Sequence, residues 1–166
     1  IAVIEEYGAD ALRCFLIRHI PPFEDSDVTM ERFKEVYNAD LANGLGNVVA
    51  RIMRLVEAHL PMPIPRPQPV GFHNTYTDAL EHYEFNRALD FVWEQIRKLD
   101  QKITDTEPFK VVKTDLEKGR EIIAELATDL YFVARMINPV MPATARAIKE
   151  SILSNKRPDN LFPRKE

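Results

Sequence analysis

The chain has 166 residues, 45% of them hydrophobic and 29% charged, which is the balance of one soluble globular domain and excludes a disordered tail. Its formal net charge of −4 excludes nucleic-acid binding by bulk electrostatics, so any RNA contact has to be local, and composition alone favours a protein-binding scaffold. A single cysteine excludes an internal disulfide, the four histidines lack metal-site spacing, and no apolar run is long enough to span a bilayer. We therefore expect a cytoplasmic protein without metal, membrane or DNA partners.

The first predicted element is a helix with an apolar face. Apolar residues recur at helical intervals from Val3 to Leu16, which predicts a helix that ends near Arg18, although residues 16–20 also suit a short strand. Two prolines at 21 and 22 stop this helix, and the acidic segment 24–27 predicts a solvated loop without the spacing of a calcium site. The chain starts with Ile and not Met, inside this pattern, so we expect a fragment of a longer protein.

A long second helix is predicted from Thr29, a suitable N-cap, to about Leu60. Its apolar positions form one stripe, which consists of Leu41, Leu45, Val48, Ile52 and Leu55. Another face is polar, with a repeat every four positions at Asn43, Asn47 and Arg51. Gly44 and Gly46 lack the preceding strand and the Lys-Ser/Thr ending of a phosphate-binding loop, so we interpret them as places of close helix contact.

The rest of the chain alternates helical patterns with prolines. Prolines at 61, 63, 65, 67 and 69 predict a stiff connector inside one domain. Helical spacing then predicts a third helix from about 74 to 103, a fourth from about 115 to 137 and a fifth that ends near 153, before an extended tail at 161–164. We therefore predict an all-α fold, an antiparallel helix bundle joined by modest loops.

No constellation of catalytic residues is recognisable in the sequence. The histidines are interpreted as surface or helix-end residues: His19, His59, His73 and His82. Cys14 falls in the first apolar stripe and is expected to be buried and inert, and Trp93 falls in the core register of the third helix. The chain itself is therefore predicted to be non-catalytic.

Five segments, in order along the chain, carry a resemblance to a known family. They are residues 7–13 (YGADALR), 37–51 (YNADLANGLGNVVAR), 103–109 (ITDTEPF), 138–142 (NPVMP) and 161–164 (LFPR). Together they resemble the C-terminal part of the methionyl-tRNA synthetases, which are class Ia aminoacyl-tRNA synthetases, over essentially the whole chain. The resemblance implies an antiparallel bundle of the class Ia anticodon-binding type. It places a stem-contact or connector segment at 1–28, after a missing catalytic domain, and a helical anticodon-binding domain at 29–166.

The resemblance also implies which residues bind RNA. The anticodon-binding positions of the family fall on Asn43, Asn47, Arg51, Pro108 and Phe109. Asn and Arg pair well with the Watson–Crick edges of splayed bases, which suits the CAU anticodon loop of tRNA(Met). One departure is Phe109, where the family usually has Trp: a smaller ring without the indole donor is expected to hold the first anticodon base less strongly. We expect this ring to be exposed in a turn between helices.

For the full-length enzyme the resemblance implies ATP-dependent ligation of methionine to its tRNA through methionyl-adenylate, with magnesium accompanying ATP. The HIGH and KMSKS signatures and the zinc-knuckle cysteines of the family are absent from this sequence. We therefore expect no catalytic residue and no cofactor site in this chain, which would contribute selectivity through binding. Its expected partners are the anticodon loop of tRNA(Met) and its own N-terminal catalytic domain.

Two alternatives stay open from the sequence. One is the anticodon domain of another class Ia enzyme, such as the leucine, valine or cysteine enzyme, against which Asn47, Arg51 and the Pro108-Phe109 pair argue. The other is a helical scaffold that binds proteins, which the negative net charge and the proline connector favour. Binding to an anticodon stem-loop of the methionine tRNA separates these alternatives.

Overall fold

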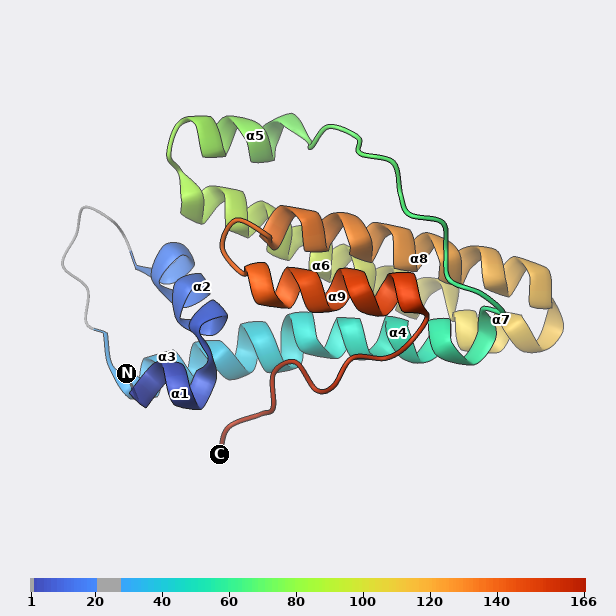
Figure 1. Ribbon diagram of the computed structural model, residues 1–166, viewed down its shortest axis with the longest axis horizontal. Helices are drawn as coiled ribbons and strands as arrows, with labels where there is room; N and C mark the ends of the chain where they lie inside the picture. Colours follow the sequence, from blue (N-terminus) through green and yellow to red (C-terminus); the bar gives the residue numbers. More distant parts are fainter. Residues whose placement is uncertain (1, 21–27) are drawn as a thin grey trace.

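The computed structural model describes residues 2–20 and 28–166 (Figure 1). Every regular element in these two ranges is a helix, so the predicted all-α fold is confirmed. In chain order the elements are α1 (Ala2–Tyr7), α2 (Ala9–His19), α3 (Met30–Val36), the π-helix η1 (Tyr37–Gly46), α4 (Asn47–His59), α5 (Asn74–Glu81), α6 (Phe85–Thr106), α7 (Pro108–Thr114), α8 (Leu116–Ile137) and α9 (Pro142–Ser154). The proline pair at 21–22 and the acidic segment 24–27 lie outside the described residues.

The helices α4, α6, α8 and α9 lie side by side in an elongated bundle (Figure 1). Helix α8 is central, because it packs against α4, α6, α7 and α9. Its buried face includes Ile123, Leu126, Leu130 and Ile137, and each such side chain stabilises the fold by roughly 1.5–3 kcal/mol when it leaves water. The proline-rich segment 60–73 runs as an extended strap to α5, and α2 packs at one end of the bundle against η1, α6 and α9.

Two of the predicted helices are interrupted by a residue in the left-handed region. The first breaks at Gly8, whose φ of 86° suits glycine, so that α1 and α2 are separate. The predicted third helix breaks near Tyr83, whose φ is 59°, and continues as α6. The prediction of a short strand at 16–20 is wrong, because α2 continues to His19.

One helix, α7, lies where the sequence predicts only a turn. Glu107 ends α6 in the left-handed region with a φ of 42°. Pro108 then starts α7 at its first position, where a helix needs no amide donor. Phe109 therefore lies in the first turn of a helix and not in a turn between helices, although its ring is exposed as expected. Asp115 is the N-cap of α8, the predicted fourth helix, and its side chain accepts a hydrogen bond from the Lys118 amide at 3.0 Å.

The long helix predicted from Thr29 is confirmed as the continuous run of α3, η1 and α4. The Thr29 hydroxyl caps it by accepting a hydrogen bond from the Arg32 amide at 3.2 Å, and the predicted apolar stripe is buried throughout. In the wide turns of η1, a Cβ on Gly46 would lie 2.8 Å from the Leu41 carbonyl oxygen and 3.5 Å from the Phe162 ring. Gly46 is thus a place of close contact, but its neighbours are the preceding turn of its own helix and the C-terminal tail, and not a second helix as expected.

A buried carboxylate fixes α2 to the last helix. Asp10 accepts hydrogen bonds from the amide of Thr144 at 2.7 Å and from its hydroxyl at 2.9 Å, across 134 positions of sequence. Arg13 donates to the other carboxylate oxygen of Asp10 and, from Nε, to the Val140 carbonyl oxygen at 2.9 Å. Asp10 thereby satisfies an amide in the first turn of α9, which has no partner inside its own helix.

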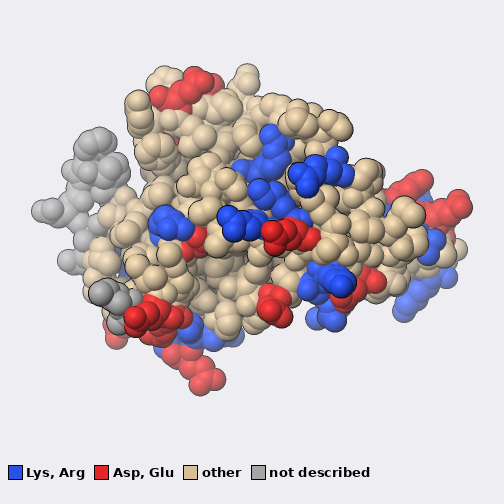
Figure 2. All heavy atoms as spheres, viewed as in Figure 1, with Lys and Arg blue, Asp and Glu red and all other residues tan. Residues whose placement is uncertain are grey.

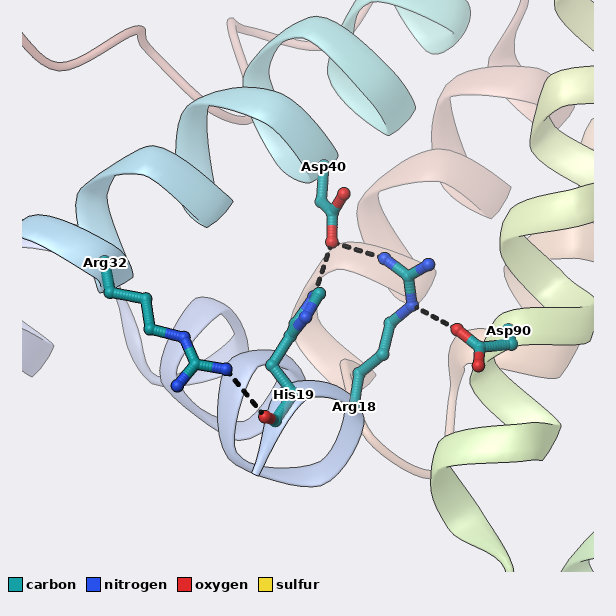
Figure 3. A network of polar contacts seen from close by, with 5 residues as sticks. All are labelled: Arg18, His19, Arg32, Asp40 and Asp90. Atoms are coloured by element: carbon teal, nitrogen blue, oxygen red, sulfur yellow. Dashed lines mark hydrogen bonds and ion pairs between the residues drawn. The ribbon is translucent and has the colours of Figure 1, made fainter. Parts of the chain in front are cut away.

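A second polar cluster joins α2 to η1 and α6 (Figure 3). Asp40 accepts hydrogen bonds from Arg18 and, at 2.7 Å, from Nε2 of His19, while Arg18 also donates to Asp90 at 2.9 Å. Arg32 donates to the His19 carbonyl oxygen at 3.4 Å. Burial raises the pKa of Asp40, but the hydrogen bond from His19 and the charge of Arg18 outweigh burial and hold that pKa below its usual value. His19 lies at a helix end as expected, but its partner Asp40 could not be predicted from the sequence.

Replacing Asp40 by Asn is expected to lower the free energy of unfolding at pH 7 by about 1–3 kcal/mol, because hydrogen bonds to a charged group are lost. A carboxyl whose pKa is lowered by folding stabilises the protein above its unfolded pKa and loses this contribution as the pH falls through its folded pKa. Urea unfolding between pH 7 and pH 3 should therefore show a shallower pH dependence for Asp40→Asn than for the wild type. Asp90→Asn is the control, since Asp90 is 61% exposed and its removal leaves Arg18 paired with Asp40. Identical pH curves for Asp40→Asn and the wild type would contradict this assignment.

The two residues predicted to pack rather than react are in the core. Cys14 is 2% exposed, and burial raises the pKa of its thiol to about 12, so it is protonated and inert at neutral pH. Trp93 is 4% exposed, and the Arg18 guanidinium lies 4.7 Å from the centre of its ring. The predicted burial of both residues is confirmed.

Candidate nucleic-acid interface

The polar face of the long helix borders a cleft. The cleft has a volume of about 750 Å³ and lies between η1 and α4 on one side and the C-terminal tail, residues 155–166, on the other. Asn43 and Asn47 line it from the helix side, one turn apart. The two asparagines are exposed, and the apolar stripe of the same helix faces the core. Their amide groups are therefore available to a ligand in the cleft.

The tail that forms the other wall is held by the first turns of η1. Asn38 clamps the backbone of Lys165: its Nδ2 donates to the carbonyl oxygen at 2.8 Å, and its Oδ1 accepts from the amide at 2.9 Å. The Tyr37 hydroxyl donates to the Pro163 carbonyl oxygen at 3.1 Å. Phe162 is 6% exposed and packs edge-on against the Tyr37 ring, with 6.1 Å between centroids. The cleft thus has two fixed walls.

Arg51, the third predicted RNA-binding residue of this helix, points elsewhere. It forms an ion pair with Asp100 of α6 and does not line the cleft. The side chains of the pair are 35% and 44% exposed, so the pair contributes little to stability. The structure therefore brings Asn43 and Asn47 together and places Arg51 one turn further, at the boundary between α4 and α6.

Pro108 and Phe109, the remaining predicted residues, lie on α7. Pro108 is buried and Phe109 is 43% exposed. Helix α7 packs mainly on α8 and also contacts α4. The five predicted residues thus lie on three elements, Asn43 on η1, Asn47 and Arg51 on α4, and Pro108 and Phe109 on α7, and α4 contacts both of the others.

Because Phe109 is exposed, we expect two substitutions of it to change RNA affinity in opposite directions. Phe109→Ala should weaken binding to a CAU stem-loop by about 1–3 kcal/mol, because a base loses its stacking surface, while Phe109→Trp should strengthen binding. Unfolding free energies should move by only about 0.5 kcal/mol, as is usual for surface substitutions. Fluorescence anisotropy with the labelled stem-loop and urea unfolding measure the two quantities.

The matched control for this ring is Phe85→Ala, since Phe85 is 45% exposed at the start of α6. This variant should keep the affinity of the wild type for the stem-loop. If Phe109→Ala instead lowered the unfolding free energy by about 3 kcal/mol or more, as truncation of a core phenylalanine does, the ring would belong to the bundle and its assignment to base stacking would fail.

The sequence did not indicate the other polar and charged residues at this site. Arg157, Asn160 and Arg164 line the cleft from the tail, and Asp100 pairs with Arg51 across 49 positions of sequence. A regular spacing reports residues that share one helix, so it contains no sign of contacts between distant segments. Among the described residues, no group of His, Cys, Asp and Glu side chains is arranged to hold a metal ion, and no helix is long and apolar enough to cross a membrane.

Comparisons with known proteins agree on one family. A family model described as tRNA synthetases class I (M) matches residues 2–53. The methionine–tRNA ligase of Enterococcus faecalis is 32% identical over 166 residues and that of Caldanaerobacter subterraneus is 27% identical over 164 residues, each match covering 90% of this chain. Among solved structures, the apo methionyl-tRNA synthetase of Mycobacterium tuberculosis matches 99% of this chain with a TM-score of 0.75 and 22% identity.

These matches cover only part of each relative. The chain spans 25% of the Enterococcus ligase, 26% of the Caldanaerobacter ligase and 40% of the Mycobacterium chain. The likeness to the solved structure establishes the helical fold, and the relatives of known sequence show that the chain is similar to part of the methionine–tRNA ligases.

Proposed function

We infer from these similarities that the chain is a piece of a methionyl-tRNA synthetase, and we propose that it forms the domain that binds the CAU anticodon of tRNA(Met). The observation that supports this most is the placement of Asn43 and Asn47, exposed and one turn apart, on the wall of a polar cleft. Arg51 lies on the next turn of the same helix. Residues of these types at these positions are what the resemblance implies for an anticodon reader.

The side chains have the chemistry that single-stranded bases require. An Asn amide offers a donor and an acceptor, and Arg offers a planar set of donors, so both can pair with the Watson–Crick edge of an unstacked base. Phe109 would add a stacking surface, and Pro108 would fix the start of the helix that carries it. For Arg51 to reach a base, its guanidinium would have to leave Asp100 or share hydrogen bonds with it.

A catalytic domain would precede this chain in the full-length enzyme. We propose that residues 1–28 connect a catalytic domain to the anticodon-binding domain at 29–166. The catalytic domain would form methionyl-adenylate from methionine and ATP, with magnesium, and transfer the methionyl group to the tRNA in the cytoplasm. This chain would contribute by binding and orienting the tRNA.

The experiment is a titration of the chain with a labelled anticodon stem-loop of tRNA(Met) and with a hairpin of the same stem and an unrelated loop. We expect the CAU stem-loop to bind more tightly. Equal affinity for the two hairpins would remove the anticodon-binding proposal, and together with capture of a protein partner it would favour the scaffold alternative.

A further inference from the structure

The cleft beside Asn43 and Asn47 contains cationic groups that base reading does not use. Arg54 of α4 and Arg157 and Arg164 of the tail line it. Arg157 is tied to Glu57, through Nε at 2.5 Å and through its amide at 3.3 Å. Arg54 and Arg164 are exposed, and neither forms a hydrogen bond or ion pair within the described part of the chain.

The charge balance of the cleft favours an anion. Since Arg157 neutralises Glu57, the remaining charged groups of the lining are Arg54 and Arg164 against Asp159. The chain as a whole carries a net charge of −4, and on the face seen in Figure 2 the Lys and Arg side chains are interspersed with Asp and Glu and with uncharged areas. An anion would therefore be attracted by these local guanidinium groups and not by the field of the whole molecule.

We propose that Arg54 and Arg164 bind the phosphate backbone of the RNA whose bases Asn43 and Asn47 contact, an inference that rests on the proposed function. A guanidinium group matches the geometry of a phosphate through two parallel N–H donors. Arg54 is on the same helix as the asparagines and Arg164 is on the opposite wall, so a strand lying in the cleft would meet a cation on each side.

The tail wall is fixed before RNA binds. Asn38 holds the backbone of Lys165, next to Arg164, and Phe162 is buried two positions before Arg164. Lys165 in turn donates from Nζ to the Glu6 carbonyl oxygen at 2.9 Å. A ligand thus meets an ordered wall, and the loss of conformational freedom on binding is smaller than for a flexible tail.

The test is the salt dependence of RNA binding by the double variant Arg54→Gln/Arg164→Gln. We expect affinity for the CAU stem-loop to fall roughly ten- to a hundredfold at low salt, since hydrogen bonds to charged groups are lost. We expect the slope of log K against log salt to become shallower by about 1.4, which is about 0.7 for each phosphate contact with a single strand. The preference for CAU over a changed anticodon should remain, because backbone contacts do not read sequence.

The control is Arg66→Gln/Arg146→Gln, which removes the same charge at exposed positions on the strap and on α9. It should leave the slope close to that of the wild type. An unchanged slope in Arg54→Gln/Arg164→Gln, with CAU still preferred, would overturn the phosphate site and leave the proposed function standing. Loss of the CAU preference with an unchanged slope would also overturn it, since the arginines would then read bases. If the wild type shows no CAU preference, the proposed function fails, and the slopes still decide whether the cleft binds phosphate.

Discussion

The double variant Asn47→Ala/Arg51→Ala is expected to bind the CAU stem-loop about a hundredfold more weakly than the wild type. A well-placed bidentate contact to a base contributes about 1–3 kcal/mol, and about 1.4 kcal/mol corresponds to a tenfold change in affinity. The fold should survive, because Asn47 is exposed and the Arg51–Asp100 pair lies at the surface, where such pairs contribute up to about 1 kcal/mol. Anisotropy titrations measure the affinity, and circular dichroism during urea unfolding measures the stability.

The matched control for this variant is Asn86→Ala/Arg87→Ala. These residues are of the same types, both are exposed, and Arg87 pairs at the surface with Glu84 at 2.5 Å. This control should bind the stem-loop as the wild type does. If Asn47→Ala/Arg51→Ala also bound as the wild type does, the face assigned to base reading would be wrong.

Replacing Gly119 by Val should produce the largest loss of stability, about 3 kcal/mol or more, because it overpacks the contact between α7 and α8. A Cβ at Gly119 would lie 2.4 Å from Cγ1 of Val112 and 2.8 Å from the Cα and N atoms of Val112. Since two of these three atoms belong to the backbone, α7 has to move as a unit. Helix α7 carries Phe109, so we expect the variant also to bind the stem-loop more weakly.

The control is Gly71→Val, since a Cβ at Gly71 meets nothing within 4 Å. Urea unfolding of the two variants gives the comparison. Equal stabilities for Gly119→Val and Gly71→Val would mean that α7 does not pack on α8 as closely as these distances require.

The helices that bury an apolar stripe could be predicted from the sequence, but their interruptions could not. The stripe through Leu41 and Ile52 follows from a period of about 3.6 residues, and the Thr29 cap follows from its hydroxyl. The break at Tyr83 depends on a left-handed residue that is neither Gly nor Asn, so composition gave no warning of it. Helix α7 could have been predicted, because proline is common at the first position of a helix. We instead interpreted Pro108 as part of a turn.

Part of the candidate site could also be predicted from the sequence, and part of it could not. The exposure of Asn43 and Asn47 follows from their distance from the apolar stripe. A repeat of four residues rotates by about 40° at each step around a helix with about 3.6 residues per turn. Arg51 therefore lies at a different angle around the helix from Asn43, on the side that faces Asp100 and not the cleft. The second wall of the cleft comes from the tail, more than a hundred positions away, through contacts such as that of Asn38 with Lys165, 127 positions apart.

Anticodon reading by this chain is tested most directly by the ratio of two dissociation constants, measured at one salt concentration. One is for the CAU stem-loop, and the other is for a stem-loop that differs only in the first anticodon base, UAU. Loss of a specific base contact is worth about 1–3 kcal/mol, so we expect the CAU stem-loop to bind roughly ten- to a hundredfold more tightly. A ratio of one, with both RNAs bound, would contradict anticodon recognition.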